Sequence, residues 1–188
     1  MNRAKARELV ALLGDVPFAL RMLADYPGAA APEENETTYR GNALLKARAA
    51  TRLTGKWSLG DDSGLEVDAL GGAPGLYSAR YGGPGLDDAG RRALLLDALR
   101  DVPDERRTAR FRCVIAIVDS EGREWVVEGV AEGTITREPR GVGGFGYDPL
   151  FSYTPLGRTF AELSDAEKSD VSHRGRAAAE ARRVLIAS

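Results

Sequence analysis

The sequence predicts an α/β fold, and three observations support this. Segments with apolar residues three or four positions apart, typical of helices, occur among segments with alternating apolar and polar residues, typical of strands. Connections of hairpin length occur beside longer crossovers. No Pro- or Gly-rich linker divides the 188 residues cleanly, so we expect a single domain over residues 1–188.

The predicted helices begin at residues with capping chemistry. Asp87 is a candidate N-cap, Ser164 forms a capping box with Glu167, and Ser172 can cap the last helix. The predicted helices cover 4–13, 39–53, 88–100, the segment after Ser164, and 173–186.

Strands are predicted where short apolar runs end at turn residues. Two long strands, near 108–119 and 124–137, are joined by "DSEGR" and predict a hairpin. Shorter strands are expected at 18–20, 57–59 and 65–70, and "GGAPGLYSARYGGPG" is expected to form a long loop.

Composition limits the partners and the compartment. The net charge of −2 gives no electrostatic reason to expect a nucleic acid or an anionic membrane as partner. The single Cys113 lies in the apolar run "CVIAIV", which predicts a buried thiol. There is no apolar stretch of membrane-spanning length and no apolar N-terminal signal, so a cytoplasmic location is expected.

Asp61 and Asp62 form an adjacent acidic pair at the predicted junction between strands 57–59 and 65–70. One interpretation is a solvated turn whose carboxylates cap backbone amides. The other is a site for a hard cation such as Mg²⁺, which would offset the repulsion between the carboxylates and bridge phosphate oxygens.

Two later segments favour nucleotide chemistry. "GVGGFGYDP" combines glycines, which let backbone amides approach a ligand, with the aromatic Phe145 and the carboxylate of Asp148; a structural glycine-rich turn is the alternative. "EKSDVSHRGRA" brings Lys168, His173 and Arg174 together in sequence, and the last two begin a helix, where an anion is favoured. An ordinary basic surface is the alternative.

Three segments, taken in order, resemble the inosine triphosphatase family of non-canonical purine nucleoside triphosphate pyrophosphatases: "DDSGLEVDALGGAPGLYSARY", "TREPRGVGGFGYDPLF" and "AELSDAEKSDVSHRGRA". The similarity covers essentially the whole chain. It implies an elongated mixed β-sheet with flanking helices that form two lobes around a nucleotide cleft, usually in a homodimer. It also implies Mg²⁺-dependent hydrolysis of ITP, dITP and XTP to the monophosphate and pyrophosphate, which removes deaminated purines from the nucleotide pool.

The resemblance implies roles for individual residues. Asp62 matches the family's catalytic carboxylate, which binds the metal and accepts a proton from water, and Asp61 is its neighbour and helper. Asn2 and Lys5 match a loop that holds the triphosphate, and Glu8 continues that motif. Ser63 matches a substrate contact. The nucleoside-binding motif is matched by Phe145, Gly146, Tyr147 and Asp148, and further base and substrate contacts are matched by Lys168, His173 and Arg174.

The chain departs from the family pattern at two places. The strand and the Thr that normally precede the position of Asn2 are absent, through either a late start assignment or a true loss. Gly41 stands where members often carry a metal-binding Glu, and Glu36 or another upstream carboxylate is a candidate replacement. Both departures favour a rival hypothesis, a nucleotide-binding protein without turnover. A nucleotide hydrolase with a different base preference is a second rival.

Overall fold

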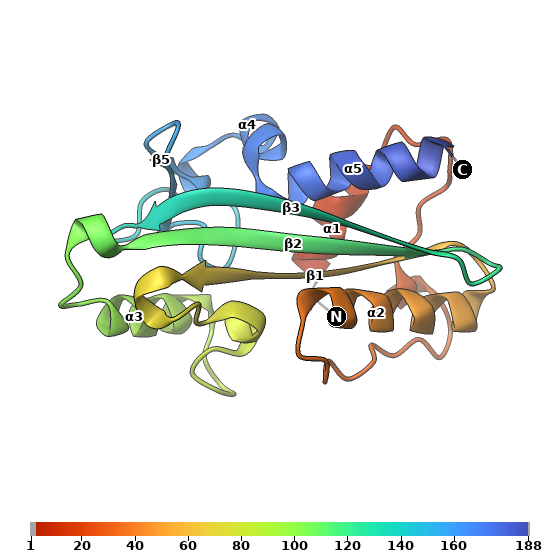
Figure 1. Ribbon diagram of the computed structural model, residues 1–188, viewed down its shortest axis with the longest axis horizontal. Coiled ribbons are helices and arrows are strands. Elements are labelled where there is room, and N and C mark those ends of the chain that lie inside the picture. The colour runs from red at the N-terminus through yellow and green to blue at the C-terminus, as the bar shows by residue number, and fades with distance from the viewer. Residues whose placement is uncertain (1–2, 188) are drawn as a thin grey trace. The chain divides into compact units, whose positions relative to one another are not determined.

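The computed structural model describes residues 3–187. Within this range it contains five α-helices and a five-stranded sheet, so the predicted α/β class is confirmed (Figure 1). The helices are α1 (Arg3–Leu12), α2 (Tyr39–Thr54), α3 (Asp88–Ala98), α4 (Asp165–Val171) and α5 (His173–Ala187). The strands are β1 (Ser58–Val67), β2 (Thr108–Val118), β3 (Glu124–Ile135), β4 (Phe151–Tyr153) and β5 (Arg158–Thr159). None of the helices in residues 3–187 is both long and apolar enough to cross a membrane.

The strands lie in the sheet in their chain order, β1-β2-β3-β4-β5. β2 and β3 form the predicted hairpin, in which the Asp119 N–H donates to the Arg123 carbonyl oxygen (3.1 Å). The Asp119 carboxylate accepts hydrogen bonds from the N–H groups of Glu121 and Arg123 and so stabilises the turn. β4 is antiparallel to both β3 and β5.

The strand predictions are wrong in three places. The sequence predicts two strands, 57–59 and 65–70, on either side of the acidic pair, whereas β1 runs without interruption from Ser58 to Val67. The segment 18–20 is irregular because it pairs with no strand of the described chain. The sequence does not predict β4 and β5, because strands of three and two residues are too short to show an alternating pattern.

The chain divides into two compact units. The first unit takes in the chain up to Asp62, Cys113–Gly129, and the chain from His173 onward. The second takes in Ser63–Arg112 and Val130–Ser172. Each unit has its own core.

In the first unit, β2 is buried on both faces. Because successive side chains of a strand point to opposite faces, alternate residues join two different clusters. α1 and α5 cover one face and α2 covers the other (Figure 1). Cys113 is buried, as predicted, and burial raises the pKa of its thiol to about 12. The residues facing α1 and α5 are Cys113, Ile115 and Ile117, and those facing α2 are Val114, Ala116 and Val118.

Two glycines let helices approach these strands closely. A Cβ at Gly60 would lie 2.3 Å from the Ala43 carbonyl oxygen in α2. A Cβ at Gly129 would lie 2.1 Å from the His173 carbonyl oxygen in α5. Any side chain at either position would push the helix away from the sheet. Gly60 and Gly129 therefore place the two helices that carry the charged side chains described below.

In the second unit, the core is built around three aromatic rings. The Phe151 centroid lies 4.8 Å from those of both Phe111 and Phe160. Leu95 and Leu99 pack against the same cluster. The apolar face of α3 is therefore explained by burial in this core.

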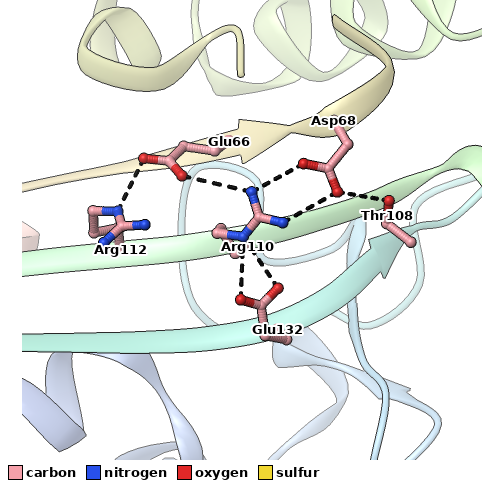
Figure 2. A network of polar contacts seen from close by, with 6 residues as sticks. All are labelled: Glu66, Asp68, Thr108, Arg110, Arg112 and Glu132. Atoms are coloured by element: carbon pink, nitrogen blue, oxygen red, sulfur yellow. Dashed lines mark hydrogen bonds and ion pairs between the residues drawn. The ribbon is translucent and has the colours of Figure 1, made fainter. Parts of the chain in front are cut away.

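In the second unit, the face of β1, β2 and β3 that points away from the aromatic core is charged (Figure 2). Arg110 of β2 donates hydrogen bonds to Asp68, which follows β1, and to Glu132 of β3. Arg112 donates to Glu66 of β1 (3.0 Å). Arg110 and Arg112 flank a core phenylalanine in β2, so alternation places both on the face away from the aromatic core. We refer to these side chains, with Thr108, as the Arg110 network.

Candidate functional site

Asp62 is a buried carboxylate held by α2. Asn42 Nδ2 donates to Asp62 Oδ2 (3.2 Å), and Lys46 Nζ donates to Asp62 Oδ1 (3.1 Å). Asn42 and Lys46 are four positions apart on α2, so both reach the same side of the helix. Lys46 Nζ also lies 2.7 Å from Glu34 Oε1. Each oxygen of Asp62 is therefore held by one donor, which orients the carboxylate.

Burial changes the protonation equilibria of this group. It raises the pKa of Asp62 above its ordinary value, against the opposing effects of Lys46 and Asn42. Burial lowers the pKa of Lys5, which lies in α1, although Asp61 and Asp62 oppose this shift. The first unit thus contains a carboxylate and an ammonium whose neutral forms are favoured by burial. Such shifts are typical of residues that exchange protons at functional sites.

Asp61 points to the other side of β1, as expected for neighbouring residues of a strand. Its Oδ2 lies 3.9 Å from Arg174 Nε of α5, and Arg174 Nη1 donates to Glu8 Oε2 of α1 (2.6 Å). Asp61 Oδ2 is buried and accepts no hydrogen bond from a described residue. The two carboxylates therefore share neither a turn nor a face. Their repulsion is reduced because each lies beside its own cation.

His173 and Arg174 begin α5, as predicted, but they form no solvent-exposed patch. His173 is 4% exposed and Arg174 is 2% exposed. Both belong to the first unit, whereas Lys168 belongs to the second. Asn2 lies outside the described residues.

The carboxylate oxygens of this site are ligands of the kind that suits the Mg²⁺ expected from the resemblance. Among residues 3–187, no three His, Cys, Asp or Glu side chains converge as a preformed metal cage. Mg²⁺ commonly binds one or two carboxylates and completes its shell with water and substrate phosphates. Asp62 fits this requirement, because its carboxylate is held in place by Asn42 and Lys46, and each carboxylate oxygen has more than one acceptor position.

Glu36 occupies the space beside Gly41. A Cβ built at Gly41 would lie 2.8 Å from Glu36 Cβ and 2.9 Å from Glu36 Oε2. The Glu36 N–H donates to Asn42 Oδ1 (3.1 Å), and the same Asn42 binds Asp62. The structure thus places a carboxylate beside the position where the family pattern has Glu, and the replacement of that Glu by Glu36 stays a prediction.

In the second unit, Phe145, Asp148 and Lys168 form one cluster. Lys168 Nζ donates to Asp148 Oδ2 (2.7 Å), and the Phe145 N–H donates to the same oxygen (2.9 Å). Lys168 Nζ lies 5.1 Å from the centroid of the Phe145 ring. The cluster combines an aromatic face, a cationic donor and a carboxylate acceptor, three features that suit recognition of a nucleobase.

Three other predicted site residues lie in this unit. Tyr147 is buried in the core, burial raises the pKa of its hydroxyl, and that hydroxyl donates to the Ser78 carbonyl oxygen (2.9 Å). Ser63 is buried in β1, directly after Asp62. Gly146 lies between Phe145 and Tyr147, and its backbone N–H and carbonyl oxygen are bound by two side chains of α3.

Sequence reasoning missed Asn42 and Lys46, the two residues that hold Asp62. The signal was present in "GNALLKARAA", where two polar residues four positions apart border the buried Ala43 and Ala47. A polar residue beside a small apolar helical face is a candidate for a buried partner.

Comparison with known proteins agrees with the predicted family. The model of the Ham1 family matches residues 1–184. A dITP/XTP pyrophosphatase of Desulforamulus reducens is 49% identical over 184 residues, which cover 98% of this chain and 92% of that protein. A dITP/XTP pyrophosphatase of Escherichia coli O157:H7 is 49% identical over 179 residues, 94% of this chain and 90% of that protein.

Solved structures agree as well. A HAM1 protein from Coxiella burnetii superposes with a TM-score of 0.90 at 40% identity, over 100% of this chain and 96% of that one. A nucleoside-triphosphatase, dITP/XTP pyrophosphatase, from Mycobacterium abscessus superposes with a TM-score of 0.76 at 47% identity, over 96% of this chain and 93% of that one. The family expected from the sequence is confirmed, and the chain belongs to the Ham1 family.

Proposed function

We propose that this protein hydrolyses ITP, dITP and XTP to the nucleoside monophosphate and pyrophosphate. The observation that carries the proposal is the buried Asp62, oriented by Asn42 and Lys46, in a chain whose relatives are named dITP/XTP pyrophosphatases. The reaction belongs to the hydrolases that act on acid anhydrides.

The first unit supplies the chemistry of phosphate hydrolysis. Asp62 accepts the proton of a water molecule whose oxygen forms a new P–O bond, while the anhydride bond between the α- and β-phosphates breaks and its electron pair stays on the leaving oxygen. A raised pKa makes this carboxylate a stronger base. The ammonium group of Lys46, and Lys5 in its protonated form, offset charge on the phosphates. Asp62 would hold Mg²⁺, which would supply further neutralisation of phosphate charge when bound.

The second unit supplies base recognition. Hypoxanthine and xanthine present an oxo acceptor at position 6, which suits the Lys168 ammonium beside the Phe145 ring. Adenine presents an amino donor there, and two facing donors leave a buried group unsatisfied at a cost of about 1–3 kcal/mol. Guanine shares the 6-oxo group, so its exclusion depends on its 2-amino side.

Separation of the products by anion-exchange chromatography tests the proposal. We expect IMP and pyrophosphate from ITP, XMP and pyrophosphate from XTP, and far slower turnover of ATP and GTP. IDP with orthophosphate would place the cut at the wrong anhydride. Tight nucleotide binding without any product would favour the rival hypothesis of a binding protein.

The resemblance also predicts a homodimer, and the composition predicts a cytoplasmic location; both stay predictions. Light scattering of the purified protein tests the first, with a mass near twice 20.1 kDa expected.

A further inference from the structure

Helix α3 holds the backbone of the loop that carries Phe145. Asp88 Oδ2 accepts a hydrogen bond from the Gly146 N–H (2.9 Å), and Arg92 Nη1 donates to the Gly146 carbonyl oxygen (2.8 Å). Asp88 and Arg92 are four positions apart on α3, so both side chains reach the same point. Both polar groups of the Gly146 backbone are therefore bound by charged side chains, which form stronger hydrogen bonds than neutral ones.

Gly146 is one of three glycines in this loop with left-handed backbone, together with Gly141 and Gly144. Its φ is +61°, in the left-handed region, which glycine adopts readily. The residue after it, Tyr147, is anchored through its hydroxyl on Ser78. The residue before it is Phe145, whose N–H donates a hydrogen bond to the Asp148 carboxylate and whose ring lies near Lys168 Nζ. The orientation of the Phe145 ring therefore depends on the backbone conformation at Gly146.

We propose that Asp88 and Arg92 are positioning residues of the nucleobase-binding cluster. They act through Gly146 on the Phe145 ring and do not contact the substrate. The inference rests on the proposed function, because it needs Phe145 to face the base. It goes beyond that function by assigning control of the base-binding loop to a helix outside the loop.

The first experiment compares Arg92→Ala, Arg92→Lys and the control Arg100→Ala. Arg100 is the second residue after the same helix, its side chain is 73% exposed, and it pairs with Asp97. We measure KM and kcat for ITP, and the Kd for IMP by calorimetry without metal. Arg92→Ala is expected to raise KM and the Kd about tenfold with kcat within about twofold, because the groups that act on the phosphates are unchanged. Arg92→Lys keeps a cationic donor and is expected to recover most of the affinity, and Arg100→Ala is expected to match the wild type.

Asp88→Ala provides a second test of the same point. The Asp88 side chain is 52% exposed, so its replacement leaves the core intact, and it removes the acceptor of the Gly146 N–H. The same split between KM and kcat is expected. Asp88→Ala decides the matter if Arg92→Ala fails to fold.

The outcomes separate the inference from the proposed function. A folded variant whose KM and IMP affinity stay within twofold of the wild type overturns the positioning role and leaves the proposed function intact. A wild-type protein that neither hydrolyses ITP nor binds IMP overturns the proposed function, and the inference falls with it.

Discussion

Two groups of charged residues beside the same strand, β1, differ in their environment. The Arg110 network lies in the second unit (Figure 2). Its side chains are partly exposed, with Asp68 at 43% and Glu132 at 65%. Hydrogen bonds from Thr108 and Arg110 lower the pKa of Asp68, and the bond to Asp68 raises the pKa of Arg110. In the first unit, burial instead raises the pKa of Asp62 and lowers the pKa of Lys5.

The difference separates charges that support the fold from charges suited to chemistry. In the Arg110 network, the pKa shifts of Asp68 and Arg110 favour the ionised forms. Both groups therefore stay charged near neutral pH and are poorly suited to proton transfer. Around Asp62, desolvation outweighs the neighbouring cation, and the carboxylate is a stronger base than an exposed aspartate. Four predictions test this comparison or the surroundings of Asp62, from the largest expected effect to the smallest.

Asp62→Asn is expected to have the largest effect. The amide keeps the shape of the side chain but can neither accept the proton nor ligate the metal well, so kcat for ITP should fall at least about a hundredfold. Asp68→Asn is the matched control, since it changes an aspartate of the Arg110 network and should leave kcat within about twofold. Near-normal turnover of Asp62→Asn at saturating Mg²⁺ would contradict the assignment.

Lys46→Met should change the pH dependence. Activity requires ionised Asp62, so it is lost as the pH falls through the pKa of this group. Lys46 lowers that pKa, and its removal should therefore raise the pKa further and move the acidic limb of the kcat profile to higher pH. Arg48→Met is the control, because Arg48 lies on the same helix but pairs with Glu124. An acidic limb that does not move would show that it reports another group.

The acidic pair shows what the sequence can and cannot predict. Helices were predictable because their caps are local, and Asp87 and Ser164 cap α3 and α4 as expected. "DDSG" is typical of a turn, yet these residues lie inside β1, because Asp62 is bound from α2 and Asp61 lies beside Arg174 of α5. Partners so distant in sequence leave no local pattern.

The cluster in the second unit was more predictable. Phe145 and Asp148 lie in one short motif, and only Lys168 had to be brought from a distant position. The α3 contacts to Gly146 were not predictable, because backbone groups have no sequence signature and α3 shows only an ordinary amphipathic pattern. Positioning residues are therefore harder to find from sequence than the side chains that they position.

The third prediction concerns Gly41 and tests whether the Glu36 side chain occupies the space that a side chain at position 41 would fill. Alanine in a helix is favoured over glycine by about 1 kcal/mol. A Cβ at Gly41 would, however, lie 2.8 Å from Glu36 Cβ, so the wild-type protein should gain no stability from Gly41→Ala. In a Glu36→Gly background, the gain of about 1 kcal/mol should appear. Urea unfolding of the wild type, the two single variants and the double variant gives the coupling free energy between positions 36 and 41. Equal effects of Gly41→Ala in both backgrounds would mean that Glu36 does not occupy this space in solution.

The smallest effect is expected for Arg110→Met. Arg110 binds Asp68 bidentately and also bonds Glu132, yet partly exposed ion pairs contribute only about 0–1 kcal/mol, and salt screens them. The free energy of unfolding should fall by less than about 1 kcal/mol at low ionic strength and by still less in 0.5 M NaCl, a salt level at which the Debye length is only about 4 Å. Turnover of ITP should not change. A large loss of kcat in a folded Arg110→Met variant would show that charges outside the buried site also serve the reaction, and the division between the two groups would then be wrong.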